Sequence, residues 1–236
     1  MLQQTQVERV IPFYKNFIKK FPTAKVLAST PLSDVLAAWN GLGYNRRAKM
    51  LREATRQITS ISISSYRIDL IRLIQELEKL PGVGPYTARA VAAFAFNQDA
   101  IFVETNIRTA VIHHFFPDVG STRPYIKISD KEIEKVLEKA LPKGRAREWY
   151  SALMDYGAYL KRSGVKLNTK SKHYTKQSKF EGSFRQVRGA ILKALTAKKP
   201  LASVRKTYPD RFKPALAALA RDGLVKKVKA STYILF

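Results

Sequence analysis

The stretch from residue 80 to residue 87 reads Leu-Pro-Gly-Val-Gly-Pro-Tyr-Thr and lies between two segments with helical spacing of apolar residues. Before it the apolar positions are Leu70, Ile74 and Leu77, and after it they are Ala88, Val91, Ala92 and Ala95. Pro85 suits the first position of the second helix. We expect Gly82 and Gly84 to adopt positive φ and to bring the hairpin backbone close to another surface. The amides that open the second helix then favour an anion, which predicts a phosphate-binding hairpin; a plain helical connector is the alternative.

Positive charge dominates the chain. Lys and Arg number 43 against 18 Asp and Glu, which gives a formal net charge of +25. This balance favours a nucleic-acid surface, so the expected anion at the hairpin is a DNA phosphate, as in a helix-hairpin-helix motif. A membrane partner is disfavoured because no uncharged run of about 18 apolar residues is present. No secretory signal peptide opens the chain, and we expect a cytoplasmic, nucleoid-associated protein.

The chain contains no cysteine. Disulfides, cysteine zinc sites and iron–sulfur clusters held by thiolates are therefore excluded. His113 and His114 are adjacent and point in different directions on a helix, and His173 stands apart, so we expect no metal site. A monovalent cation in the hairpin is compatible with the sequence.

Apolar periodicity predicts an all-α domain over residues 1–161. Further helices are expected over residues 7–20, 32–39, 46–58, 106–115, 130–141 and 145–160. Ser129 is the expected N-cap of the helix that begins at residue 130. Residues 162–182 are polar and basic and predict a linker, either a DNA-contacting arm or a solvated segment.

Residues 183–236 predict a separate, small winged-helix-like domain. Apolar spacing indicates helices around residues 187–195, 202–208 and 212–220, followed by two short strands over 224–228 and 233–236. The third helix could enter a major groove; a protein-binding or packing role is the alternative.

Several motifs, in order, resemble those of the adenine-specific mismatch DNA glycosylases, a family of the helix-hairpin-helix superfamily that includes endonuclease III. They are the opening Met-Leu-Gln-Gln-Thr-Gln-Val followed by Ile11-Pro12, residues 41–48, the hairpin of residues 80–87, residues 103–108 and residues 154–158. The resemblance covers about 160 residues. It implies a base-excision repair enzyme that removes adenine mispaired with guanine or 8-oxoguanine from double-stranded DNA, and we expect a monomer.

The resemblance implies three residues at the reacting sugar. Such an enzyme flips the base out of the duplex and stabilises positive charge on the sugar as the base departs. Glu104 stands where the family has its catalytic carboxylate, there usually Asp, and catalysis is sensitive to misplacement of about 1 Å. Asn106 matches a residue that supports the carboxylate and the sugar. Tyr86 stands where bifunctional relatives have an imine-forming lysine, so a monofunctional glycosylase is expected.

Each of these three residues has a simpler interpretation. Glu104 could be a solvated or ion-paired surface acid. Asn106 could be a helix N-cap. Tyr86 could be a packed aromatic.

The resemblance also implies DNA contacts. Gln4 and Thr5 match residues that wedge into the base stack, Tyr44 matches an aromatic wedge, and Leu2 matches a base-pocket contact. Arg46, Arg47, Lys49 and Arg52 would make a phosphate-facing helix. The complete set of expected DNA-binding residues is Gln3, Gln4, Thr5, Tyr44, Arg46, Arg47, Gly82, Val83, Gly84 and Thr87.

The chain departs from the family pattern in three places. The family's purine-protonating glutamate lies two residues before the opening motif, upstream of Met1; we expect a clipped start, with a genuinely shortened protein as the alternative. The four cluster cysteines that commonly follow the motif of residues 154–158 are absent, and we expect the Tyr174 region to pack there instead. Residues 183–236 are too short for the family's larger β-rich domain, so weak discrimination of 8-oxoguanine from guanine is expected.

Two other functions stay open on the sequence. One is a glycosylase for mismatched thymine or uracil, since related pyrimidine enzymes share the hairpin, the tyrosine and the acid. The other is a non-catalytic DNA-binding protein derived from the glycosylase fold.

Overall fold

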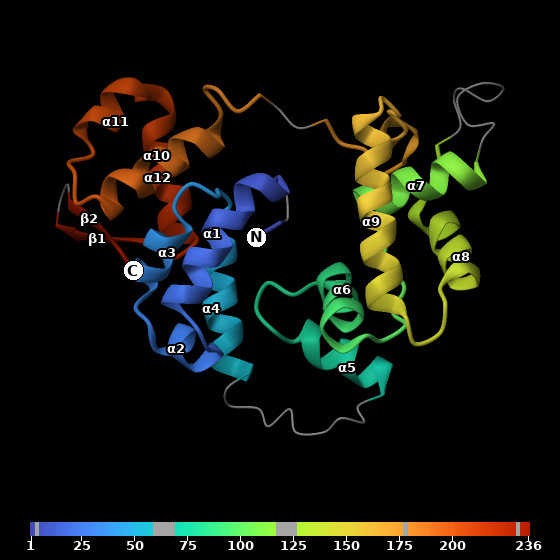
Figure 1. Ribbon diagram of the computed structural model, residues 1–236. Coiled ribbons are helices and arrows are strands. Elements are labelled where there is room, and N and C mark those ends of the chain that lie inside the picture. Colours follow the sequence, from blue (N-terminus) through green and yellow to red (C-terminus); the bar gives the residue numbers. More distant parts are fainter. Residues whose placement is uncertain (3–4, 59–68, 117–126, 177–178, 230–231) are drawn as a thin grey trace. The chain divides into compact units, whose positions relative to one another are not determined.

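The computed structural model describes residues 1–2, 5–58, 69–116, 127–176, 179–229 and 232–236. Over these residues the chain is mainly helical, with one small antiparallel sheet near its end (Figure 1). It divides into two compact units. The first comprises residues 1–64, 80–82 and 178–236, and the second comprises residues 65–79 and 83–177.

The first unit contains two groups of helices. The N-terminal group is α1 (Val7–Lys20), α2 (Ala24–Ser29), α3 (Leu32–Trp39) and α4 (Arg46–Ile58), and the C-terminal group is α10 (Phe184–Thr196), α11 (Ala202–Thr207) and α12 (Pro209–Arg221). Their buried side chains form one apolar core, because α10 contacts α3 as well as α12. Trp39, Ile191 and Leu219 are among its fully buried members.

The second unit holds α5 (Leu70–Glu78), α6 (Pro85–Phe96), α7 (Thr105–Phe115), α8 (Asp130–Ala140) and α9 (Ala146–Arg162). The longest of these, α9, crosses α7 and packs against it, and α8 also packs against α7 (Figure 1). Phe102, Ile107, Ile133 and Tyr150 are the centre of the core between them.

Most expected helices are confirmed. The observed bounds of α1, α3 and α4 coincide with the predicted ranges, and Ser129 caps α8 through a capping box with Glu132. The sequence reasoning missed α2, which has only six residues, too few for a period to show; Thr23 caps it by accepting a hydrogen bond from the Val26 amide.

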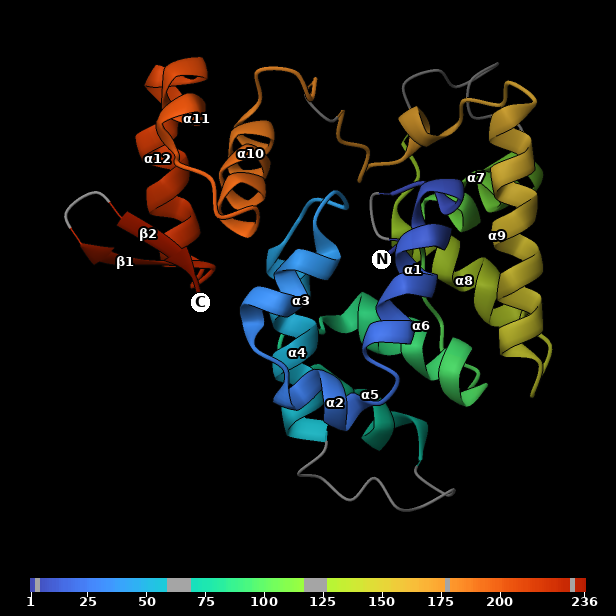
Figure 2. The same ribbon diagram turned by 60° about the vertical axis from the view of Figure 1, so that its left-hand side comes forward.

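The C-terminal segment has the expected three helices and β-hairpin. Strand β1 (Val225–Lys229) pairs antiparallel with β2 (Thr232–Leu235), and the register places Val225 opposite Leu235 and Lys226 opposite Ile234. An irregularity interrupts the ladder between Lys227 and Lys229. In Figure 2 the hairpin lies beside α12, which it contacts through β1.

Residues 162–182 are not a simple extended linker in their described part. A 3-10 turn at Asn168–Lys170 is followed by a bridge between Ser171 and Ile128, and Ser171 is fully buried. The Thr109 hydroxyl of α7 donates to the side-chain oxygen of Asn168 at 3.1 Å. This segment packs against α7, in the region around Tyr174 where packing was expected, although the Tyr174 side chain itself is 44% exposed. The division into domains at residues 161 and 182 stays a prediction.

Candidate active site

Glu104 caps α7. Its side-chain oxygen Oε1 accepts hydrogen bonds from the backbone amides of Asn106 and of Ile107, the latter at 3.1 Å. A carboxylate is favoured there because the amides and the helix dipole present partial positive charge. Glu104 is therefore held in place rather than a free surface acid, and the alternative that Asn106 is the N-cap is wrong.

Tyr86 lies in the first turn of α6, and the charge of Glu104 acts on its hydroxyl. Burial raises the pKa of its phenol, and the negative charge of Glu104 raises it further. The ring makes an edge contact with Phe102, with centroids 5.9 Å apart, yet the residue is 42% exposed. Tyr86 is thus a protonated hydroxyl at neutral pH that solvent, or a substrate, can reach.

Asn106 meets a residue that sequence reasoning missed. The ammonium of Lys161, at the end of α9, donates to Asn106 Oδ1 at 2.5 Å. Lys161 is half-buried; burial lowers its pKa, the negative charge of Glu104 raises it, and the positive charge of Arg108 lowers it. No spacing rule connects positions 106 and 161, so only the tertiary structure reveals the pair.

Gly157 lies one turn before Lys161 and lets α9 approach α7. A Cβ at this position would overlap the backbone carbonyl of Asn106. The glycine belongs to the motif of residues 154–158 singled out above, but its reason was not visible in the sequence.

Arg108 anchors the same end of α7. Its guanidinium makes two hydrogen bonds to the carboxylate of Asp130 at the start of α8, at 2.8 and 2.9 Å. Paired donors of this kind fix an orientation as well as adding energy. Side chains from α7, α8 and α9 therefore hold the segment that carries Glu104 and Asn106.

The two hairpin glycines differ. Gly82 has φ +77°, as expected, and a Cβ there would lie 2.6 Å from the Cβ of Met50 in α4. Gly84 has φ −95°, so the expectation of positive φ was wrong at this position. It is instead the N-cap of α6, it brings no side chain, and a Cβ there would meet open space. Gly84 thus leaves the start of α6 accessible to a large partner, together with Val83 and Thr87, which lie beside it.

The loop that precedes α4 presents Tyr44. This residue has φ +48° and is 43% exposed. The Arg47 guanidinium lies over the rings of both Tyr44 and Trp39, at 5.4 and 5.5 Å, and donates to the carbonyl oxygen of Gly43 at 3.5 Å. Burial lowers the pKa of Arg47. Arg47 thus supports the tyrosine from inside, and an exposed ring held in an unfavourable backbone conformation is typical of a functional loop.

The expected phosphate-facing helix α4 is partly wrong. Arg52 is buried, and its Nε donates to the Thr30 carbonyl at 2.6 Å. Lys49 donates to the Asp222 carbonyl at 3.0 Å. These two cations fasten α4 to its own unit, whereas Arg46 is exposed.

The N-terminal segment is described only in part. Leu2 is 56% exposed and Thr5 is half-exposed. Gln3 and Gln4 lie outside the described residues, so their expected DNA contacts stay predictions.

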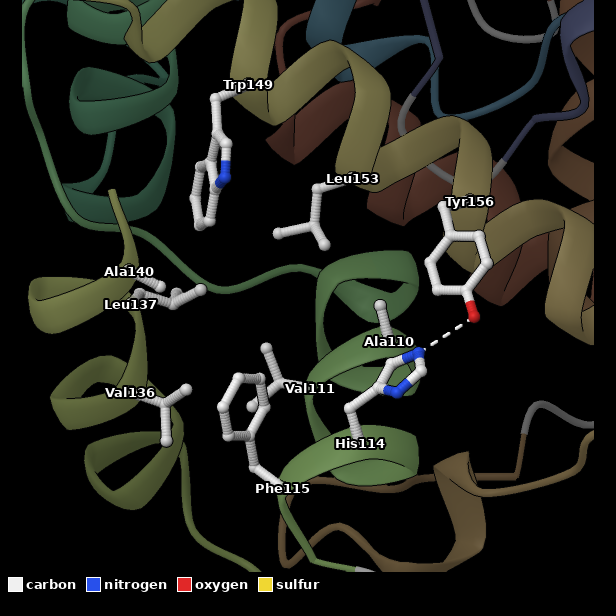
Figure 3. Close-up of a pocket in the computed structure, with 10 residues that line it drawn as sticks. All are labelled: Ala110, Val111, His114, Phe115, Val136, Leu137, Ala140, Trp149, Leu153 and Tyr156. Atoms are coloured by element: carbon white, nitrogen blue, oxygen red, sulfur yellow. Dashed lines mark hydrogen bonds between the residues drawn. The ribbon is translucent and has the colours of Figure 1, made fainter. Parts of the chain in front are cut away.

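An apolar cavity of about 60 Å³ lies between α7, α8 and α9 (Figure 3). Its wall includes Phe115, Trp149 and Leu153, and His114 Nε2 lies 2.8 Å from the Tyr156 hydroxyl at its edge. None of the expected site residues lines it. In the part of the chain that the structure describes, no three His, Asp or Glu side chains gather as metal ligands, and no helix is long and apolar enough to cross a membrane.

The chain is strongly basic, and the start of α6 after the hairpin is open to a partner. A carboxylate, Glu104, is fixed at the start of the following helix α7. These features are typical of an enzyme that acts on DNA. The sequence profile described as "HhH-GPD superfamily base excision DNA repair protein" matches residues 1–143, and the chain belongs to this superfamily. It is accordingly a base-excision repair glycosylase, an enzyme that acts on N-glycosidic bonds of DNA.

Named relatives and solved structures of similar sequence also act on DNA bases or belong to the same superfamily. The chain is 32% identical to an adenine DNA glycosylase of Mycolicibacterium smegmatis over all of this chain and 84% of that protein. It is 32% identical to the Homo sapiens adenine DNA glycosylase over 67% of this chain but only 28% of that protein. A thermostable thymine-DNA glycosylase structure matches with a TM-score of 0.54 at 25% identity, over 73% of this chain and 79% of that one. A trapped endonuclease III–DNA intermediate matches with a TM-score of 0.50 at 25% identity, over 70% and 71%.

Proposed function

We propose that this glycosylase excises adenine mispaired with guanine or 8-oxoguanine in double-stranded DNA, acting as a monomer in the nucleoid. The observation that carries the proposal is the carboxylate of Glu104, which caps α7 beside Asn106 and whose charge acts on the Tyr86 hydroxyl of α6. Support comes from the adenine DNA glycosylase relatives, one of which spans the whole chain, and from the motifs of residues 1–7 and 41–48.

The proposed chemistry follows from these side chains. As the bond to the base breaks, adenine leaves with the bonding electrons and takes up a proton, and positive charge develops at C1′ of the sugar. The Glu104 carboxylate stabilises that charge or attacks the carbon, and water then adds its hydroxyl to C1′ to complete the hydrolysis. The amide of Asn106 orients the sugar beside it. Tyr86 has no amine and forms no imine with the sugar, so the base–sugar bond is cut and the strand is left intact.

The iron–sulfur cluster common in this family does not fit this chain. Such a cluster is held by four cysteine thiolates, and the chain has none. We propose that the enzyme works without it, and no step above depends on it. Residues 168–171, which pack on α7, follow the same helix that precedes the cluster in relatives.

A second candidate is excision of thymine or uracil from mismatches with guanine. The observation that favours it is the structural likeness to a thymine-DNA glycosylase. The adenine proposal is preferred because Gln3, Gln4 and the loop of residues 41–44 match adenine enzymes.

Single-turnover excision tests both candidates. The substrates are duplexes with A·G, A·8-oxoguanine, G·T and G·U pairs, and the chain is assayed alone and with an upstream extension that restores the family glutamate. We expect release of adenine only. Release of thymine or uracil instead would establish the second candidate, and binding without release in every arm would indicate a non-catalytic protein.

The variant Glu104→Gln identifies the carboxylate. It keeps the size of the side chain and removes its charge, so we expect excision to fall by about 10²–10³-fold while duplex binding persists. Glu138→Gln, at an exposed position of α8, is the matched control and should excise at the wild-type rate. An unchanged rate in Glu104→Gln would show that Glu104 is not catalytic.

A further inference from the structure

Two residues of α9 contact the same residue of α7. Gly157 and Lys161 are four positions apart and therefore lie on one face of the helix. Gly157 faces the backbone carbonyl of Asn106, and Lys161 holds its side-chain oxygen at 2.5 Å. This face of α9 thus packs against the start of α7, which Glu104 caps.

The ammonium of Lys161 dictates how the Asn106 amide is oriented. An ammonium only donates hydrogen bonds, so the oxygen of the amide must face Lys161. The amide NH₂ group then points away from α9. Without Lys161 the amide can rotate by half a turn at little cost, and its donor would no longer have a defined direction.

The surrounding charges support this assignment. Glu104 is the acid whose charge acts on Lys161, and the nearby cation Arg108 is engaged by both oxygens of Asp130. Burial opposes the charged form of Lys161, and the contact with Asn106 offsets part of that cost. The ammonium of Lys161 is therefore hydrogen-bonded within the site.

We propose that Lys161 is a positioning residue for base excision, which directs the Asn106 amide donor toward the sugar and thereby sets the geometry at Glu104. The proposal rests on the proposed function, because it assigns Lys161 a part in the same site. It predicts that the two side chains act as one unit, since Lys161 does nothing for catalysis except through Asn106.

A double-mutant cycle tests this unit. We expect Lys161→Met to slow single-turnover excision by about 10²-fold, as a displacement of about 1 Å would. Asn106→Ala should cost at least as much, and adding Lys161→Met to Asn106→Ala should cost nothing more. Lys161→Arg should restore part of the rate, since it keeps a donor near Oδ1. The exposed neighbour Arg162 supplies the control Arg162→Met, which loses the same charge and should keep the wild-type rate.

A readout independent of activity completes the experiment. In amide NMR spectra, Lys161→Met should shift the side-chain NH₂ signals of Asn106, and Arg162→Met should leave them in place, with all variants melting cooperatively. If neither the chain nor its upstream-extended form excises a base, the proposed function fails while these signals still test the pair. Unmoved Asn106 signals, or additive losses of rate in the cycle, would overturn the positioning proposal.

Discussion

Tyr86 illustrates what one residue decides at this site. Burial and the negative charge of Glu104 raise the pKa of its hydroxyl, and a hydroxyl cannot form an imine. Tyr86→Lys should therefore supply the missing amine and convert the chain toward strand cleavage at abasic sites. The measurement is borohydride trapping on a duplex with an abasic site: we expect a covalent adduct for Tyr86→Lys and none for Tyr86→Phe. Equal trapping in the wild type would contradict the monofunctional assignment.

Motifs predict which residues form the site, but they do not predict the contacts of those residues. Glu104, Asn106 and Tyr86 stay predictions from motifs, and the structure shows that Glu104 caps α7 through the Asn106 amide. Lys161 was missed because it meets Asn106 across 55 positions of sequence. Arg52 was expected to face phosphate because of its position in the family resemblance, whereas its Nε donates to the Thr30 carbonyl.

At the scale of elements, the packing of α9 on α7 depends on the absence of a side chain at Gly157. Gly157→Ala would force a methyl group onto the Asn106 carbonyl, so we expect a loss of roughly 1–3 kcal/mol in the free energy of unfolding. Gly189 in α10 is the control, because a Cβ there meets open space; Gly189→Ala should stabilise by about 0.5–1 kcal/mol. Denaturant unfolding measures both, and equal effects would contradict the packing argument.

Tyr150 of α9 predicts how stability depends on pH. Burial raises its pKa from 10.0 to about 12. As pH rises above 10 the unfolded chain loses this proton first, so the stabilisation present below pH 10 is lost toward pH 12. Tyr150→Phe should flatten that decline in the unfolding free energy. At pH 7 it should cost about 1 kcal/mol, because the Phe102 amide loses its acceptor; an unaltered alkaline decline would exclude Tyr150 as its source.

At the scale of the whole molecule, charge predicts where duplex DNA is held. The acidic residues of 183–236 are Asp210 and Asp222 alone, and Asp222 is paired with Arg188 at 2.5 Å. Lys226, Lys227 and Lys229 are all exposed on β1. Lysine is a point charge on a flexible stem, so it neutralises phosphates whatever the base sequence. We therefore expect the hairpin lysines to contact phosphates without reading the sequence.

Salt dependence of duplex binding checks this expectation. Replacing all three hairpin lysines by Ala should lower the slope of log K against log salt by about 0.9 for each phosphate that the variant no longer neutralises. Affinity for matched and mismatched duplexes should fall alike. The control replaces Lys131, Lys135 and Lys139, which are exposed on α8, and removes the same charge. Equal slopes in the two triple variants would mean that net charge alone matters.

The sequence by itself determined most of the helices and the hairpin, and it predicts the residues of the reacting site. Apolar spacing, helix caps and motifs each involve residues that are close in sequence, so they can be recognised without the tertiary structure. Only the tertiary structure decided that Gly157 and Lys161 meet Asn106 and that Lys49 and Arg52 turn inward. It also decided that residues 168–171 pack on α7. These outcomes depend on which helix faces approach each other, and that choice is made by burying the whole apolar surface at once.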